Sequence, residues 1–212
     1  MRIDLGITLL FCLVAGGARD VLGKATGETA TGNGRETYIT LVLDWAMNWG
    51  AWGQAEYCPP GTFATAFEIK VESEDATDDT SMNGIRLYCN NLIDNKQTKE
   101  LTVSSTVQKW GDWMGKRECP SGQVLTGLRM KSEEDQGNFV DDTAANDLDM
   151  QCSHSTFTLN GGGNHWGYWS TWASCPEGWA ICGLETRVES ESAGDDTALN
   201  DVRMYCCAFT AI

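Results

Sequence analysis

The sequence has few basic residues and few histidines, and both shortages narrow the possible functions. Its 212 residues include 15 Lys and Arg against 30 Asp and Glu, so the net charge is −15. Binding to phosphate requires a basic patch, and none is found, which argues against nucleic acid and against anionic lipid as partners. His154 and His165 are the only histidines and Cys-x-x-Cys is absent, so we expect no metal site and no cofactor.

Several other signals are also missing. The sequence contains no Gly-x-Ser-x-Gly, no His-Glu-x-x-His and no phosphate-binding loop, which leaves no familiar catalytic motif. No segment has the 3.6-residue hydrophobic period of an amphipathic helix. The fold class that remains is all-β.

The N-terminus is typical of a signal peptide, predicted to cover residues 1–23. An apolar run from Leu5 to Val14 is followed by the small residues 15–18, which suit signal peptidase. The run is too short to span a bilayer, so we expect a secreted, extracellular protein without membrane insertion. A buried N-terminal helix is the alternative. Residues 24–37 contain no apolar side chain larger than alanine and are predicted to be a flexible tail.

Three copies of one sequence unit follow the tail. In each copy Trp-Gly-x-Trp is followed by Cys-Pro-x-Gly, and then by a Glu, an Asp-Asp-Thr, an Asn and a second Cys at nearly constant spacing. The Trp-Gly-x-Trp copies start at Trp49, Trp110 and Trp166. We predict a single domain over residues 38–212, with repeats at about 38–98, 99–154 and 155–212.

The period within each unit is two. In the first unit Phe67, Ile69 and Val71 alternate with Glu68 and Lys70, as expected for a strand with one buried face. A four-stranded sheet with one apolar face cannot bury that face alone. We therefore predict a three-sided prism, in which three four-stranded antiparallel sheets with pseudo-threefold symmetry face one another.

Cysteines should lock this arrangement. Cys12 leaves with the signal peptide, and the eight that remain imply four disulfides in an exported chain. The repeat favours the pairs Cys58–Cys89, Cys119–Cys152 and Cys175–Cys206, which leaves Cys182–Cys207. The exchanged pairs Cys175–Cys207 and Cys182–Cys206 stay open. Each bridge should contribute roughly 3–4 kcal/mol in the chain-entropy model.

These motifs resemble the vitelline membrane outer layer protein 1 family. The resemblance rests on Trp-Gly-x-Trp, Cys-Pro-x-Gly and the segments 70–73, 78–87 and 195–207, and it covers about residues 38–207. It implies a β-prism fold, secretion, a place in the outer layer of the egg vitelline membrane, and an association with carbohydrate that includes transfer of chitooligosaccharides. One departure is Asp149, where the other units have Arg.

Acidic residues are the first candidate carbohydrate contacts, namely Glu72, Glu133 and Glu189. A glycoside-processing site needs two carboxyl groups on either side of the scissile bond, about 5 Å or about 6.5–9.5 Å apart. A simpler role is expected for the repeated Asp-Asp-Thr segments at 78–80, 141–143 and 195–197. Their side chains would cap turns by accepting hydrogen bonds from backbone N–H groups. The three Glu side chains could also form ion pairs with Lys70, Lys131 and Arg187 on the same strand faces.

Aromatic residues are the second set of candidates, because sugars stack their apolar faces on aromatic rings. Tyr168, Trp172 and Trp179 occur only in the third unit, which suits a single binding site. The repeated tryptophan pairs are predicted to pack in the core or at sheet edges. We rank the functions as a structural or protective component of an extracellular layer, a carbohydrate-binding module, and a chitooligosaccharide-transferring enzyme. Possible partners are extracellular glycans or basic secreted proteins.

Overall fold

The computed structural model describes residues 26–28, 38–73, 81–92, 100–134, 144–154, 157–190 and 199–208. The predicted signal peptide and all of the predicted tail except residues 26–28 lie outside these ranges. Every regular element within them is a β-strand. Those residues accordingly contain no helix of the length and apolarity needed to cross a membrane.

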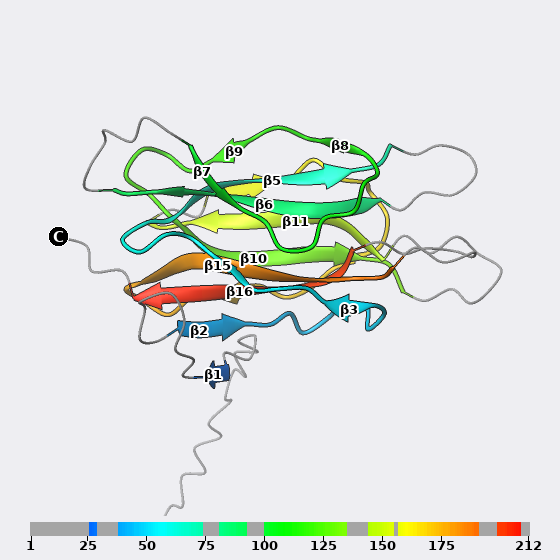
Figure 1. The fold of residues 1–212 in the computed structure, drawn as a ribbon, viewed down its shortest axis with the longest axis horizontal. Coiled ribbons are helices and arrows are strands. Elements are labelled where there is room, and N and C mark those ends of the chain that lie inside the picture. Colours follow the sequence, from blue (N-terminus) through cyan, green and yellow to red (C-terminus); the bar gives the residue numbers. More distant parts are fainter. Residues whose placement is uncertain are drawn as a thin grey trace, which may run out of the picture.

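Three long antiparallel hairpins form the centres of three sheets (Figure 1). The hairpins are β5 (Phe63–Val71) with β6 (Met82–Asn90), β10 (Leu125–Ser132) with β11 (Ala145–Cys152), and β15 (Trp179–Val188) with β16 (Leu199–Ala208). Each hairpin gains one strand on one side and two short strands, end to end, on the other. The predicted all-β prism of three sheets, each four strands wide, is confirmed.

Each sheet takes its outer strands from the following sequence unit. The β5–β6 hairpin is joined by β7 (Leu101–Val103), β8 (Asp112–Trp113) and β9 (Arg117–Glu118). The β10–β11 hairpin is joined by β12 (Thr158–Asn160), β13 (Tyr168–Trp169) and β14 (Ala173–Ser174). Neither sheet therefore coincides with one sequence repeat.

The third sheet closes the ring. Its hairpin, β15–β16, pairs with β2 (Tyr38–Leu41), β3 (Ala51–Trp52) and β4 (Glu56–Tyr57) from the first unit. Strands from the two ends of the chain thus lie in one sheet, as Figure 1 shows. A further short strand, β1 (Thr26–Glu28), pairs with β2 inside the segment predicted to be a tail.

The core lies between the three sheets. Inward residues of all three hairpins form one buried cluster that includes Phe67, Ile69, Leu128, Met150 and Ile181, each at most 1% exposed. Full burial of such a side chain stabilises the fold by roughly 1.5–3 kcal/mol. The apolar residues that alternate in the sequence are therefore the ones that face the core, as predicted.

The repeated asparagine also lies inside the prism. Asn83, Asn146 and Asn200 are fully buried, each within the first two residues of the second strand of its hairpin. Their backbone carbonyls each accept an N–H from the segment leading to the next Trp-Gly turn. The bonds join Gln108 to Asn83 (2.8 Å), Asn164 to Asn146 (2.9 Å) and Met47 to Asn200 (3.2 Å). This ties the end of each hairpin to the following unit.

The structure contains the disulfides Cys58–Cys89, Cys119–Cys152, Cys175–Cys206 and Cys182–Cys207, and not the exchanged pairs. A register shift at the same place in each hairpin explains how the last two bridges coexist. It leaves Thr65, Thr126 and Cys182 without a direct cross-strand partner. Such a bulge turns the extra residue relative to its neighbours, so Cys182 meets Cys207 while Cys206 remains in the central core cluster.

Glycine is required where each Trp-Gly turn crosses the end of a sheet. Gly50, Gly111 and Gly167 have φ of 77°, 73° and 78°. A Cβ at Gly111 would lie 2.3 Å from the carbonyl oxygen of Val71, so the turn packs directly on that strand. The other two glycines meet Val188 and Ser132 in the same way.

We predict that Gly111→Ala costs substantially more stability than Gly122→Ala. Both positions have positive φ, which costs an alanine roughly 1–2 kcal/mol, but a Cβ at Gly122 has nothing within 4 Å. The clash with Val71 should add about 2 kcal/mol or more at position 111. Urea unfolding followed by tryptophan fluorescence measures the difference. Equal losses for the two variants would show that the close packing at Gly111 contributes little.

Candidate functional site

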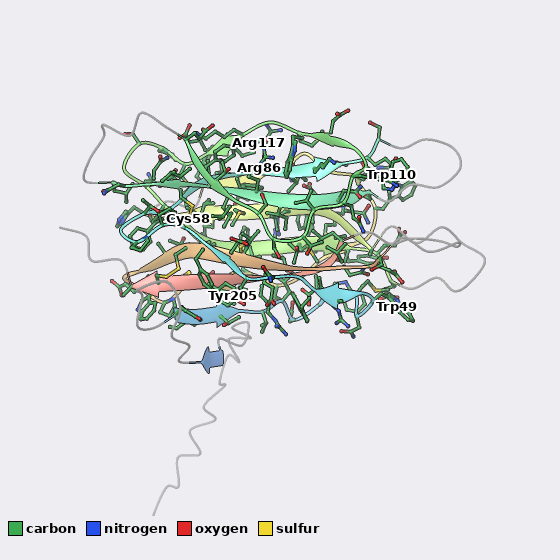
Figure 2. The ribbon with its side chains drawn as sticks, viewed as in Figure 1. Trp49, Cys58, Arg86, Trp110, Arg117 and Tyr205 are labelled. Carbon is green, nitrogen blue, oxygen red and sulfur yellow. A yellow bond between two sulfur atoms is a disulfide. The ribbon has the colours of Figure 1, made fainter. Side chains whose placement is uncertain are left out.

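Three tryptophans are exposed at one end of the prism. Trp49, Trp110 and Trp166, the first residue of each Trp-Gly-x-Trp motif, are 52%, 45% and 44% exposed. Figure 2 shows Trp49 and Trp110 at the end opposite to Cys58. We call this end the Trp-Gly end. Core or sheet-edge packing was predicted for these residues, and for the first tryptophan of each pair that prediction is wrong.

The three candidate glutamates lie at the same end. Glu72, Glu133 and Glu189 directly follow β5, β10 and β15, and each is half-buried. Each therefore lies beside a Trp-Gly turn, because the three glycines pack on the residue that precedes each glutamate. The Asp-Asp-Thr segments lie outside the described residues.

Cations fix the Trp-Gly turns. Lys70 Nζ donates to the carbonyl oxygens of Gln108 (2.9 Å) and Lys109 (2.7 Å), just before Trp110. The equivalent Lys131 donates to His165 O, and Arg187 Nε donates to Gly50 O at 3.1 Å. Lys70, Lys131 and Arg187 thus hold the backbone that presents the exposed indoles. Ion pairs of these cations with the three glutamates were an alternative raised from the sequence, and they stay a prediction.

The third unit adds further aromatic surface to the Trp-Gly end. Tyr168 is 73% exposed, and its backbone pairs with Ser132, next to Glu133. The His165 ring lies 4.1 Å from the Trp166 ring, measured between centroids. Glu133, Trp166 and Tyr168 are therefore neighbours, which makes the Trp-Gly end asymmetric.

Two predicted contacts lie elsewhere. The Trp172 ring is half-buried, and its centroid is 5.1 Å from the guanidinium carbon of Arg129. Trp179 begins β15 and packs against the central core cluster. Of the six predicted carbohydrate contacts, the structure brings Glu72, Glu133, Glu189 and Tyr168 to one end. It does not place Trp172 or Trp179 there.

An arginine on the outer face of each sheet lies between an indole and a carboxylate. The rings are Trp113, Trp52 and Trp169, the second tryptophans of the repeated pairs, and their sheet-edge positions agree with the prediction. The distance from the guanidinium carbon to the ring centroid is 3.9 Å for Arg86 and Trp113, 3.8 Å for Arg203 and Trp52, and 4.6 Å for Arg129 and Trp169. The distance from a guanidinium nitrogen to a carboxylate oxygen is 2.8 Å for Arg86 and Glu68, 3.3 Å for Arg203 and Glu185, and 2.7 Å for Arg129 and Asp149.

The second sheet holds this ion pair with its charges exchanged between the strands. Glu68 and Glu185 lie on the first strand of their hairpins, but that position in the second hairpin is Arg129, which pairs with Asp149 on the second strand. Asp149 is 3% exposed. This cross-strand exchange explains why Asp149 departs from the arginine of the other units.

Two other aspartates have perturbed acidity. Asp147 is buried, which raises its pKa, although Asn160 and the backbone N–H groups of Leu148 and Gly163 donate to it. Burial also raises the pKa of Asp201, the equivalent residue of the third unit, to about 6. Asp147 is 5% exposed and bonded on all sides, so it supports the fold and offers no surface to a ligand.

The sequence comparisons agree on one family. A sequence model of the family described as vitelline membrane outer layer protein I matches residues 41–209. The human vitelline membrane outer layer protein 1 homolog is 38% identical over 195 residues, which are 88% of this chain and 93% of that protein. The mouse homolog is 39% identical over 167 residues, or 76% and 79% of the two chains.

Several solved structures that resemble this chain are lectins. Calystegia sepium agglutinin matches with a TM-score of 0.52 and 11% identity, over 80% of this chain and 95% of that one. A mannose-specific jacalin-related lectin from Morus nigra, solved in complex with mannose, matches with a TM-score of 0.51 and 9% identity, over 84% and 99%. At such low identity, the likeness concerns the fold alone.

The exchanged ion pair generates a prediction about stability. Arg129→Glu and Asp149→Arg should each cost about 2–4 kcal/mol, because each leaves like charges facing across two strands, one of them buried. The double variant recreates the orientation of Glu68 and Arg86 and should recover part of this loss, although Asn160 also donates to Asp149. Urea unfolding of the four proteins gives the coupling energy. If the two single losses simply add, the pair is not coupled. Lys116→Ala, which removes the cation of two exposed ion pairs, serves as the control and should cost under about 1 kcal/mol.

Proposed function

Because the chain belongs to the vitelline membrane outer layer protein I family, we propose that it is a secreted component of an extracellular layer, held there by binding glycans. The observation that carries the proposal is the cluster of exposed indoles beside carboxylates at the Trp-Gly end. Four disulfides support the extracellular setting, since such bridges persist in oxidising compartments.

The chemistry of the Trp-Gly end suits sugars. Indole and phenol rings accept the apolar face of a pyranose, and carboxylates accept hydrogen bonds from its hydroxyl groups. Trp166, Tyr168 and Glu133 provide both kinds of contact within a few residues of one another. A prism lectin of the same fold has been solved in complex with mannose, so the architecture is compatible with this type of ligand.

A binding role without turnover fits the arrangement of the glutamates. Glu72, Glu133 and Glu189 occupy equivalent positions on three sheets. A repeated residue usually serves the repeated architecture, whereas glycoside cleavage requires one asymmetric pair of carboxyl groups. We therefore place these residues as carbohydrate contacts rather than as a catalytic pair.

We expect the protein without its signal peptide to bind chitotriose or mannotriose in isothermal titration calorimetry. Trp166→Ala combined with Tyr168→Ala should weaken this binding about tenfold or more, because the stacking surface is lost. Met114→Ala is the matched control, since it removes an exposed apolar side chain directly after β8 of another sheet. It should leave the affinity unchanged.

Two results would contradict the proposal. One is the absence of measurable heat with chitin, mannan and their oligosaccharides at millimolar concentration. The other is steady conversion of chitooligosaccharides by the wild-type protein, followed by chromatography, because that would make it an enzyme.

A further inference from the structure

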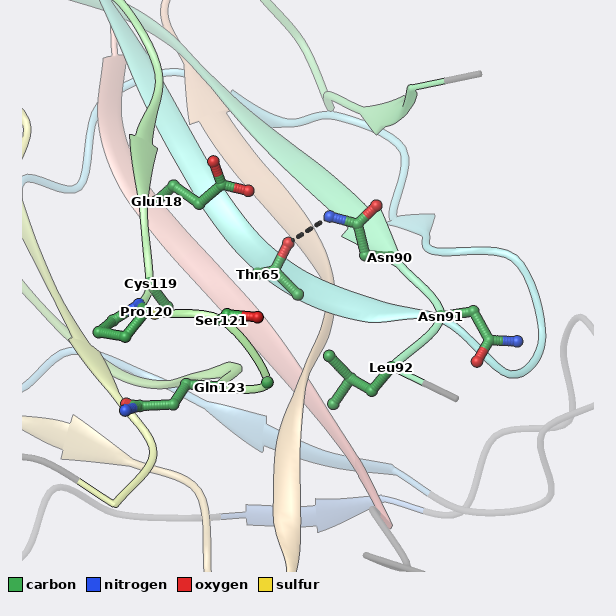
Figure 3. A pocket seen from close by; sticks show the side chains of 10 residues that line it. Thr65, Asn90, Asn91, Leu92, Glu118, Cys119, Pro120, Ser121 and Gln123 are labelled. Carbon is green, nitrogen blue, oxygen red and sulfur yellow. Dashed lines mark hydrogen bonds between the residues drawn. The ribbon is translucent and has the colours of Figure 1, made fainter. Parts of the chain in front are cut away.

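A polar pocket opens at the end of the prism opposite to the Trp-Gly end. Its volume is about 270 Å³, and it lies between the end of the β5–β6 hairpin and the second Cys-Pro-x-Gly turn. Figure 3 shows Thr65 and Asn90 on one side, joined by a hydrogen bond of 2.7 Å, and the turn residues Ser121 and Gln123 on the other. We call it the Asn90 pocket.

The pocket lies at the place where the third sheet has its additional disulfide and the first sheet has none. Thr65 and Asn90 occupy the places that Cys182 and Cys207 occupy in the third sheet, as the shared bulge and register show. In the third sheet this place is filled by the Cys182–Cys207 bridge and the packed rings of Tyr38, Tyr57 and Tyr205. Glu118 stands where Tyr57 stands there, and of the three rings only the counterpart of Tyr205, Tyr88, is present in the first sheet.

The lining residues favour an uncharged ligand rich in hydroxyl groups. Three side-chain amides, from Asn90, Asn91 and Gln123, can both donate and accept hydrogen bonds. The charged group in the lining is the Glu118 carboxylate, which lies 3.3 Å from Lys116 Nζ. Leu92 and Pro120 add apolar surface. A phosphate or sulfate group would instead require cationic groups in the lining.

Size and surroundings narrow the ligand to one sugar residue of a longer chain. Pockets for drug-sized ligands measure roughly 300–1,000 Å³, and the Asn90 pocket is slightly smaller. A second hollow shares Glu118 to Ser121 with it and is also lined by Phe157, whose side chain is 57% exposed. An aromatic face at this position can stack on a neighbouring sugar ring.

We propose that the Asn90 pocket binds one uncharged hexose or N-acetylhexosamine residue of an extracellular glycan, with Phe157 contacting the next residue. This inference rests on the proposed function, since it takes the same class of ligand. It adds a second site at the far end of the prism. One molecule can then hold two glycan chains at once, which gives a disulfide-locked prism a physical role in building a layer.

Two tryptophan substitutions at equivalent turn positions test the pocket. Ser121→Trp fills it, whereas Glu177→Trp makes the same change in the third Cys-Pro-x-Gly turn, outside the pocket. Both positions are exposed, so both variants should fold, which far-ultraviolet circular dichroism checks. The probes are chitotriose and mannotriose, titrated into ¹⁵N-labelled protein while the side-chain amide signals of Asn90, Asn91 and Gln123 are followed by NMR.

We expect these amide signals to shift in a saturable way in the wild type and in Glu177→Trp, and the shifts to fall at least tenfold in Ser121→Trp. If saturable shifts occur only near Trp166 and Tyr168, or if Ser121→Trp binds as the wild type does, the pocket proposal is wrong and the proposed function stands. If neither probe shifts any signal in the wild type at millimolar concentration, both proposals fail.

Discussion

The structure depends on one constraint, which is that an antiparallel sheet with a single apolar face must have that face covered. Here the cover for each sheet is the other two, and all three share one core cluster. Because each sheet also takes its outer strands from the next unit, no unit is complete by itself. The ring closes where β2, β3 and β4 pair with β15 and β16, and Cys58 N–H donates to Cys182 O at this junction (2.8 Å).

Much of the fold can be predicted from the sequence because its signals are local. Alternation of apolar residues identifies the hairpins, and the repeat suggests which cysteines pair. The donation of outer strands between units cannot be predicted this way, because periodicity shows which face of a strand is buried but not which strand lies beside it. The exchange of Arg129 and Asp149 is hidden for the same reason. Each residue departs from its own repeat, and only the cross-strand register shows that they compensate each other.

The candidate site was predictable in part. The repeat marks Glu72, Glu133 and Glu189, and the third unit's own Tyr168 joins them, but Trp172 and Trp179 serve the outer face and the core. The exposed first tryptophans and the Asn90 pocket were missed. One available signal was that the third unit alone has additional cysteines, Cys182 and Cys207, at the places of Thr65 and Asn90 in the first unit. In a protein with pseudo-threefold symmetry, the positions that break the symmetry are the strongest indications of function.

The most direct test of this account is a comparison of two truncated chains in urea, each followed by tryptophan fluorescence and far-ultraviolet circular dichroism. The chain of residues 38–212 keeps every outer strand of the three sheets except β1. It should unfold in one cooperative transition in which both signals coincide. The chain of residues 58–212 keeps all eight paired cysteines and all three hairpins but lacks β2, β3 and β4. It should show no cooperative transition. A cooperative transition near the midpoint of the longer chain would contradict the closed ring as the source of stability.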